Sequence, residues 1–236
     1  MKLYEELDRL FYSKDFAGAE EFLIKKSQEY AQNHEHDMEL ICYNELGGIY
    51  RKQNLREKTF WAVDKCIELI HTHGFSYSLL GDVYTSLATA YMHFAEHEKA
   101  LPLFNKAEEC YEYFYKKPNI SLATLLNNKG LCLMAMGDTV SACASFQKSI
   151  EILENLHTYP LELAMSLISL AEVKDNSDED ALYKKAAACF ESAKQDGYYA
   201  FVAEKCLPAF KRAGYFRVVK TLQDRIDEIN KKLANK

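Results

Sequence analysis

Glycine and proline are scarce in this chain, whose 236 residues contain only Gly 9 and Pro 4. β-Sandwiches and barrels need many turns, and α/β sheets need glycine-rich loops after their strands. The scarcity therefore favours long helices joined by short connections. Because 48% of the residues are hydrophobic and 27% are charged, the chain can bury a sizeable core and is not a disordered tail.

Basic residues are in the minority, with Lys+Arg 29 against Asp+Glu 35 and a formal net charge of −6. A protein that binds nucleic acid needs a basic surface, so nucleic acid is disfavoured as the main partner. The segment 211–236 is an exception, because it holds eight basic and three acidic residues. We interpret it as the solvated face of a last helix. Whether this segment or a groove is the main contact surface stays open at this stage.

Long apolar runs and a secretory signal are also missing. No stretch reaches the ~18 apolar residues of a membrane-spanning helix, and the start MKLYEELDRLF has no apolar signal-peptide core. The cysteines are odd in number and scattered, at 42, 66, 110, 132, 143, 189 and 206. This usage is typical of reduced thiols that pack as small apolar side chains. We therefore expect a cytoplasmic protein with no membrane contact.

What the chain does contain is a repeat. Three stretches align: NELGGIYRKQNLREKTFWAVDKCIEL, TSLATAYMHFAEHEKALPLFNKAEEC and NNKGLCLMAMGDTVSACASFQKSIEI. The fourth position of each is a small residue, namely Gly47, Ala88 and Gly130. A bulky residue follows three positions later, and small or apolar residues follow twelve, sixteen and nineteen positions later. Such spacings keep each set on one helical face, and small residues let two antiparallel helices approach closely.

The order small–x2–Tyr, then Ala–x3–Phe–x2–Ala, resembles the tetratricopeptide repeat (TPR). The spacing of 41 and 42 residues between the small positions is longer than the usual ~34. It is similar to the longer repeats of kinesin light chains and of bacterial regulators that sense peptides. The resemblance implies an all-α fold, a right-handed α-solenoid of about six TPR-like helix-turn-helix repeats with about twelve helices.

Weaker copies of the pattern extend to both ends, so the prediction is a single superhelical domain over 1–236. The expected repeats are 1–34, 35–74, 75–117, 118–158, 159–196 and a capping repeat at 197–236. Gly137 is expected to end the first helix of its repeat in the left-handed conformation. The acidic run 175–180 is expected to be an enlarged loop, with Ser177 or Asp178 at the N-cap of the next helix.

Catalytic patterns are weak. The stretch His93–His97 matches the zinc motif H-x-x-E-H. In the repeat register, however, His93 ends one helix and His97 begins the next, so the imidazoles do not share a continuous helix. We interpret the pairs His34/His36 and His71/His73 as solvated loop residues at repeat boundaries. No phosphate-binding glycine loop and no nucleophile elbow occurs. The prediction is a non-enzymatic protein with no catalytic residue, no metal site and no cofactor.

Several aromatic residues are candidates for recognition. Trp61, the single tryptophan, is expected to pack on a neighbouring repeat, and an exposed aromatic anchor is the alternative. The clusters 111–115 and 198–201 are expected to be core between repeats rather than recognition platforms.

The TPR resemblance implies a concave groove lined by the first helix of each repeat. The groove residues that it implies are Asn44, Glu45, Arg51, Lys52, Thr85, Ser86, Thr89, Met92, Asn127, Asn128, Leu131 and Met134. The end repeats would add Phe11, Tyr12, Glu204, Lys205 and Lys211.

These side chains suit a peptide chemically. Asparagine can bond the N–H and the C=O of a peptide at once, and methionine adapts to varied apolar side chains. Arg51 and Lys52 suit an acidic side chain or a C-terminal carboxylate. For Asn127 and Asn128, bonding to water or to neighbouring backbone is an equal alternative.

These expectations converge on a cytoplasmic interaction module or scaffold. It would bind an extended peptide or a helix of a protein partner in the groove. The alternative is a sensor of small signalling peptides that acts through protein contact. A self-assembling scaffold and a metal-binding protein are less favoured. The partner and the oligomeric state stay open.

Overall fold

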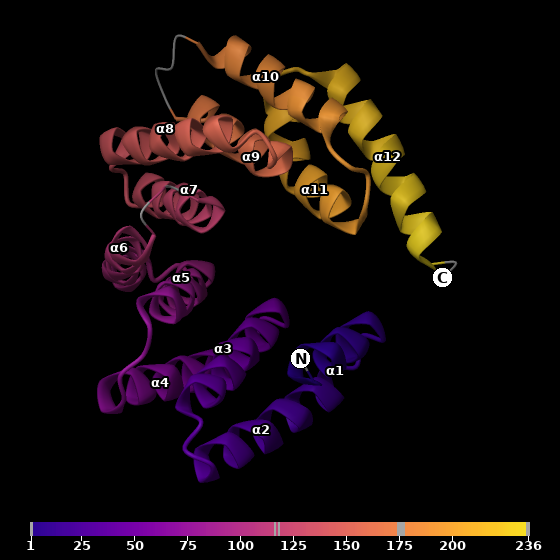
Figure 1. Cartoon of the computed structure of the whole chain (residues 1–236). Helices are drawn as coiled ribbons and strands as arrows, with labels where there is room; N and C mark the ends of the chain where they lie inside the picture. The colour runs from indigo at the N-terminus through magenta and orange to yellow at the C-terminus, as the bar shows by residue number, and fades with distance from the viewer. Residues whose placement is uncertain (1, 116, 118, 174–177, 235–236) are drawn as a thin grey trace. The chain divides into compact units, whose positions relative to one another are not determined.

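The computed structural model describes residues 2–115, 117, 119–173 and 178–234. Within these ranges the backbone forms twelve α-helices and no strand (Figure 1), which confirms the all-α class. Residue contacts divide the chain into two compact units, Met1–Phe114 and Tyr115–Lys236, and each unit is described by itself. The single domain over 1–236 stays a prediction.

Helices pair in sequence order. The first unit contains α1 (Lys2–Tyr12), α2 (Phe16–Gln32), α3 (His36–Lys52), α4 (Arg56–Thr72), α5 (Tyr77–His93) and α6 (His97–Phe114). The second contains α7 (Ile120–Ala135), α8 (Thr139–Leu156), α9 (Pro160–Ala171), α10 (Glu179–Ser192), α11 (Gly197–Arg212) and α12 (Phe216–Ala234). One helical hairpin falls in each expected repeat range. Within the first unit α3 touches α5, and within the second unit α9 touches both α7 and α11.

The turn inside five hairpins has one backbone geometry. A single residue there takes a positive φ of 56° to 85°, and these residues are Lys14, Asn54, Ala95, Gly137 and Gly214. The N–H of the next residue donates to a carbonyl oxygen five residues back, as from Asp138 to Leu133 at 3.0 Å. This bond closes the end of the first helix. The prediction for Gly137 is confirmed, and the same turn recurs where no glycine stands.

The repeat positions form the core of each hairpin. The residues twelve, sixteen and nineteen positions after the small residue are each at most 1% exposed, and they are Thr59, Val63, Cys66, Ala100, Phe104, Ala107, Ala142, Phe146 and Ser149. A Cβ built on Gly130 would lie 2.5 Å from the Phe146 ring. The absent side chain therefore lets α7 approach α8, as the pattern of small residues predicts.

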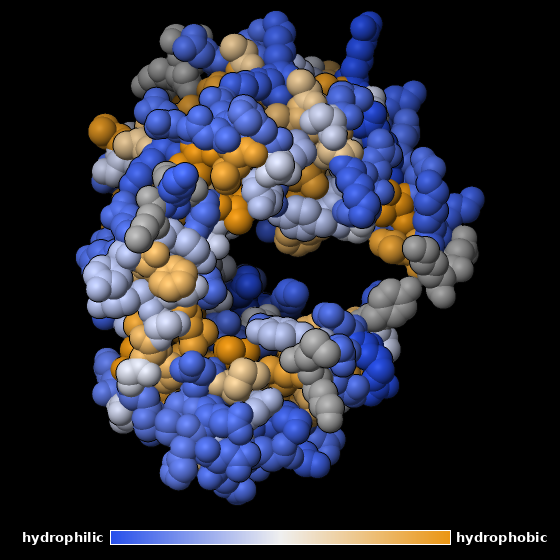
Figure 2. All heavy atoms as spheres, viewed as in Figure 1, coloured by the Kyte–Doolittle hydropathy of each residue, from blue (hydrophilic) through white to orange (hydrophobic). Residues whose placement is uncertain are grey.

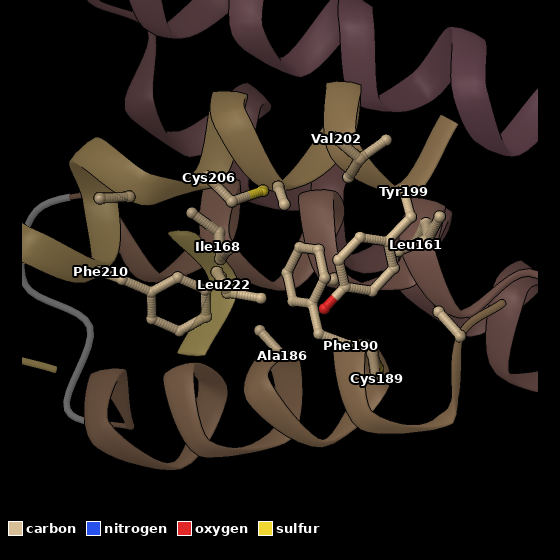
Figure 3. Close-up of a cluster of buried hydrophobic side chains, with 14 of the residues drawn as sticks. Leu161, Ile168, Ala186, Cys189, Phe190, Tyr199, Val202, Cys206, Phe210 and Leu222 are labelled. Carbon is tan, nitrogen blue, oxygen red and sulfur yellow. The ribbon is translucent and has the colours of Figure 1, made fainter. Parts of the chain in front are cut away.

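Aromatic rings fill the core at the end of the second unit. Figure 3 shows Phe190 of α10 beside Tyr199 of α11, and their ring centroids are 5.6 Å apart. The side chain of Leu222 from α12 lies in the same cluster. Figure 2 shows hydrophilic residues over much of the visible face of each unit, with patches of hydrophobic residues between them. Among the described helices, none is both long and apolar enough to cross a bilayer.

The expectation that both aromatic clusters are core is half wrong. Tyr111 and Tyr199 are buried, but Tyr113 is 73% exposed and Phe201 is 50% exposed. Consecutive residues of a helix point in different directions, so only part of such a run can face the core. For the enlarged loop at 175–180, residues 174–177 lie outside the described ranges, and Asp178 stands at the N-cap of α10.

Trp61 packs within its own hairpin. Its ring lies edge-on to Tyr43, with the centroids 5.7 Å apart, and its packing on a neighbouring repeat stays a prediction. The side chain remains 42% exposed. The reason is its register: Trp61 lies between the core positions Thr59 and Val63 and therefore points along the helix surface.

Candidate functional site

Several of the expected groove residues of the second unit lie together. The facing surfaces of α7, α9 and α11 line a pocket of about 370 Å³, here called the α7–α9–α11 pocket. Its lining includes Thr124, Asn127, Asn128, Leu131, Glu162, Met165, Ser169, Glu172, Tyr198, Phe201, Lys205 and Arg212. Three first helices thus supply one surface that is partly apolar and partly charged.

Asn127 is the unusual polar residue of this pocket. Its side chain is 7% exposed, and its Oδ1 is buried with no hydrogen-bond partner among the described residues. The helix that carries it starts at Asn119, whose side chain accepts a hydrogen bond from the Leu122 N–H at 3.0 Å. Leaving a buried carbonyl unpaired costs about 1–3 kcal/mol. Asn127 therefore lies in the wall of the pocket with its amide oxygen buried beneath the surface and unpaired among the described residues, at a cost to stability.

Two aromatic rings of α11 form another wall. Asp196 caps this helix, because its carboxylate accepts hydrogen bonds from the N–H groups of Tyr198 and Tyr199 at 3.0 and 3.2 Å. The cap orients the first turn so that Tyr198 and Phe201, one turn apart, stack with centroids 6.3 Å apart. The Lys205 ammonium lies 4.2 Å from the centre of the Phe201 ring, a cation–π geometry.

The carboxylates of the pocket are already bonded within it. Glu162 accepts a hydrogen bond from the Tyr198 hydroxyl at 2.9 Å, and Glu172 pairs with the Arg212 guanidinium. Burial, together with the hydrogen bond to Glu162, raises the pKa of Tyr198, so its hydroxyl stays protonated at neutral pH. Glu172 is therefore neutralised by Arg212, whereas Glu162 keeps its charge and is hydrogen-bonded to a neutral hydroxyl, so the pocket is partly apolar and partly charged.

The sequence predicted part of this site. Asn127, Asn128, Leu131 and Lys205 line the pocket, whereas Met134 is half-buried on α7 and does not line it. Sequence reasoning missed Met165, Phe201 and the other lining residues of α9 and α11 except Lys205. Gly214 sets the register of α11 and places Lys205 in the groove, whereas no groove residue was assigned to α9.

The expected groove residues of the first unit are divided between two environments. Asn44, Arg51 and Ser86 line a small cavity of about 30 Å³ between α3, α4 and α5, here called the Arg51 cavity. Like Asn127, Asn44 has a buried Oδ1 with no partner among the described residues.

The other expected residues of this unit do not line that cavity. The Lys52 ammonium lies 5.7 Å from the Phe11 ring centre. The Thr85 and Thr89 hydroxyls donate to carbonyl oxygens one turn earlier, at 2.8 and 2.7 Å. Glu45 and Met92 are half-buried elsewhere. The contact of any of these residues with a ligand stays a prediction.

His93 and His97 are placed as the register predicts. His93 ends α5 and His97 begins α6, and Ala95 with a φ of 59° interrupts the helix between them.

The interpretation of His36 and His71 as loop residues is wrong, because His36 begins α3 and His71 lies within α4. His36 stacks on His73 at 3.6 Å between centroids, and its Nδ1 lies 3.1 Å from a Glu39 oxygen. In the described part of the chain, no group of three or more His, Cys, Asp or Glu side chains is arranged to hold a metal ion.

No protein-family model and no curated protein matches the sequence. Solved structures do match the fold. BtubC (BKLC) from P. vanneervenii superposes with a TM-score of 0.70 at 15% identity, over 95% of this chain and 93% of that chain. A putative kinesin light chain from Podosopora anserina with nearly identical TPR-like repeats has a TM-score of 0.55 at 13% identity, over 82% and 95%. A variant of that protein gives 0.57 at 14%, over 85% and 99%. The chain therefore has the α-solenoid fold of TPR-like repeat proteins.

Proposed function

We propose that this protein is a non-enzymatic interaction module that binds an extended segment of a protein partner in the α7–α9–α11 pocket. The observation that carries the proposal is the buried Asn127 Oδ1, an acceptor without a partner among the described residues, in the wall of an open, largely apolar pocket. A protein that gained nothing from this atom would be more stable with an apolar residue there.

A peptide segment would match the pocket group by group. When the Asn127 side chain turns its amide into the pocket, its Oδ1 accepts a hydrogen bond from a backbone N–H of the segment. An apolar side chain next to that N–H packs against Leu131, Met165 and the Phe201 ring, which line the same pocket. The volume of about 370 Å³ is within the ~300–1,000 Å³ of pockets that bury small ligands. The paired carboxylates do not repel such a segment.

The repeat architecture supports a protein partner. Stacked helical repeats present extended concave surfaces, and proteins of this kind use those surfaces for binding. Among the described residues that line the pocket, no group of three or more His, Cys, Asp or Glu side chains is arranged to hold a metal ion. A cytoplasmic location and a partner protein remain part of the proposal.

Selection of peptides tests the proposal although the partner is unidentified. The full chain is immobilised, random twelve-residue peptides are selected by phage display, and the binding of the selected peptides is measured by calorimetry. Asn127→Ala and Phe201→Ala should each weaken binding by about tenfold, which is ~1.4 kcal/mol. Asn105→Ala on α6 is the matched control, because Asn105 is exposed and lies in the other unit. It should leave the affinity unchanged.

Circular dichroism and thermal melting of each variant show that it is folded before binding is measured. Peptides that keep their affinity for both pocket variants would place the binding surface elsewhere and contradict the proposal. Failure to select any peptide that binds the wild-type chain would contradict it as well.

A further inference from the structure

A second cavity of the second unit adjoins the α7–α9–α11 pocket. It has a volume of about 740 Å³ and is lined where α8 ends and α9 begins and where α10 leads into α11. It is here called the α8–α10 pocket. The two pockets share three wall residues, which are Leu153, Glu162 and Tyr198. An extended chain spans about 3.3–3.6 Å per residue, so a few residues of one segment are long enough to reach both pockets.

Glu162 differs from the other carboxylates that line these two pockets. Each of the other three forms an ion pair within the chain, and these pairs are Glu154–Lys185, Glu172–Arg212 and Asp196–Lys194. Glu162 forms no ion pair with any described residue and accepts only the hydrogen bond from the Tyr198 hydroxyl, at 2.9 Å. An ionised carboxylate has about four acceptor sites, so most of the capacity of Glu162 is unused.

The position of Glu162 in its helix favours a negative charge. It lies in the first turn of α9, directly after Pro160 and Leu161, and Tyr159 at the N-cap makes no side-chain hydrogen bond to the helix. The partial positive charge of a helix N-terminus stabilises an acidic side chain in this turn. The fold therefore holds the Glu162 carboxylate without a cation from the chain itself.

The α8–α10 pocket suits a long side chain that ends in a positive charge. Three carboxylates and two ammonium groups line it, so one negative charge, that of Glu162, is left without compensation when the histidine of the lining is neutral. The buried side chains of Leu153 and Leu161 and the Pro160 ring supply apolar surface for a hydrocarbon stem. The Tyr159 ring lines the same pocket, and aromatic rings attract cations.

We propose that the α8–α10 pocket binds the basic side chain of an arginine or lysine in the partner segment, with the Glu162 carboxylate as its counter-ion. The cation donates hydrogen bonds to this carboxylate, which retains the bond from the Tyr198 hydroxyl. The methylene stem packs on Leu153 and Leu161. The assignment of the cation to a protein segment rests on the proposed function, whereas the affinity of the pocket for a cation does not.

Nuclear magnetic resonance tests the pocket with butylguanidinium, which carries the charged group and the stem of an arginine side chain. Butylguanidinium chloride replaces sodium chloride at constant ionic strength while the amide signals of the ¹⁵N-labelled full chain are followed. The signals of Leu161, Glu162 and Tyr198 should shift and saturate with a Kd on the order of 10 mM, as expected for a ligand of this size. Butylurea has the same shape without the charge and should bind at least severalfold more weakly. No saturation by butylguanidinium, or equal binding of butylurea, would overturn the proposal.

Two matched variants separate recognition from folding. Glu162→Gln keeps an oxygen that accepts the Tyr198 hydrogen bond but removes the charge, and it should abolish the saturable shifts. Glu151→Gln is the control, because Glu151 is exposed on α8 and does not line the pocket, and it should leave the Kd of butylguanidinium unchanged. If Glu162 served only to stabilise the start of α9, the substitution would lower the melting temperature and leave butylguanidinium binding intact, which would contradict the proposal.

Peptides selected on the wild-type chain connect this site with the proposed function. They should carry an arginine or lysine within about three residues of the apolar residue that enters the α7–α9–α11 pocket. Replacing this arginine by citrulline, or this lysine by norleucine, should weaken binding by about tenfold on the wild-type chain and by less than about twofold on Glu162→Gln.

The outcomes distinguish the two proposals. Peptides that require Asn127 and Phe201 but bind Glu162→Gln with full affinity would overturn this inference and leave the proposed function standing. If butylguanidinium saturates the pocket but no peptide binds the chain, the proposed function fails, and with it the assignment of the cation to a protein segment.

Discussion

Asn44 on α3 and Asn127 on α7 occupy the same register position, three residues before Gly47 and Gly130, and both end in a buried carbonyl oxygen without a hydrogen-bond partner among the described residues. Asparagine is a poor helix former, and an unpaired buried carbonyl adds a further cost of about 1–3 kcal/mol. Both helices thus carry the same destabilising feature, an asparagine with an unpaired buried oxygen. Contact of both asparagines with a partner remains a prediction, which the variants below test for Asn127.

Replacement of Asn127 by leucine separates stability from binding. Asn127→Leu removes the unpaired oxygen and improves helix propensity, so the free energy of unfolding should stay equal or rise by about 1 kcal/mol. Binding of the peptides selected for the α7–α9–α11 pocket should be lost at the same time. Urea denaturation followed by circular dichroism measures the first effect, with Asn105→Leu on α6 as the exposed control. A loss of more than about 1 kcal/mol would assign Asn127 to the structural core instead.

Substitution by alanine should change the stability of the chain in opposite directions at two glycines of the first helices. Gly130→Ala places a methyl group 2.5 Å from the Phe146 ring and should destabilise the chain by about 1–3 kcal/mol. Gly48→Ala meets no atom within 4 Å and should stabilise it by about 0.5–1 kcal/mol, because alanine is the better helix former. Thermal melting compares the two, and equal losses would contradict the packing of α7 against α8.

Substitutions at two of the left-handed turns should also change stability in opposite directions. Ala95 holds a φ of 59°, which a side chain disfavours, whereas Gly137 takes a φ of 85° at the equivalent place. Ala95→Gly should therefore stabilise the chain by about 0.5–1 kcal/mol, and Gly137→Ala should destabilise it by about 1 kcal/mol. Denaturant midpoints measure both. Stabilisation by Gly137→Ala would show that this turn is not held in the left-handed conformation in solution.

Glu45 predicts a pH dependence of stability. Burial raises the pKa of its carboxyl, and Lys52 offsets only part of the effect. The folded chain therefore binds this proton more tightly than the unfolded chain, so the contribution of Glu45 to stability falls as the pH rises from about 4.3 through the folded-state pKa. Glu45→Gln should raise the melting temperature at pH 7 and have no such effect at about pH 4. The exposed Glu151→Gln on α8 should change the melting temperature little at either pH.

The helical hairpins could be predicted from the sequence, because the residues that define each hairpin lie close together in the chain. Gly130 and Phe146 are sixteen positions apart in one repeat, and a single packing contact explains both. The turns follow from the same register, since Gly137 stands seven positions after Gly130. Helix boundaries could be placed for the same reason, as at His93 and His97.

The α7–α9–α11 pocket could be predicted only in part, because three hairpins contribute to it and two of them carry a weak repeat pattern. Tyr198 and Phe201 were expected to be core, although Tyr199 and Ala200 are the buried residues of that run. Which arginine lacks a partner also depends on long-range geometry. Arg212 and Arg51 differ in this respect because Glu172 lies beside Arg212, forty residues away in the sequence.

The recurrent left-handed turn has a consequence for folding kinetics. Each turn is closed by a bond that spans only five residues, as between Leu133 and Asp138, so both helices of a hairpin can meet before any other hairpin is ordered. Contacts of low sequence separation speed folding, since little chain entropy is lost in forming them. Folding can therefore begin at whichever hairpin forms first and spread to its neighbours along the chain.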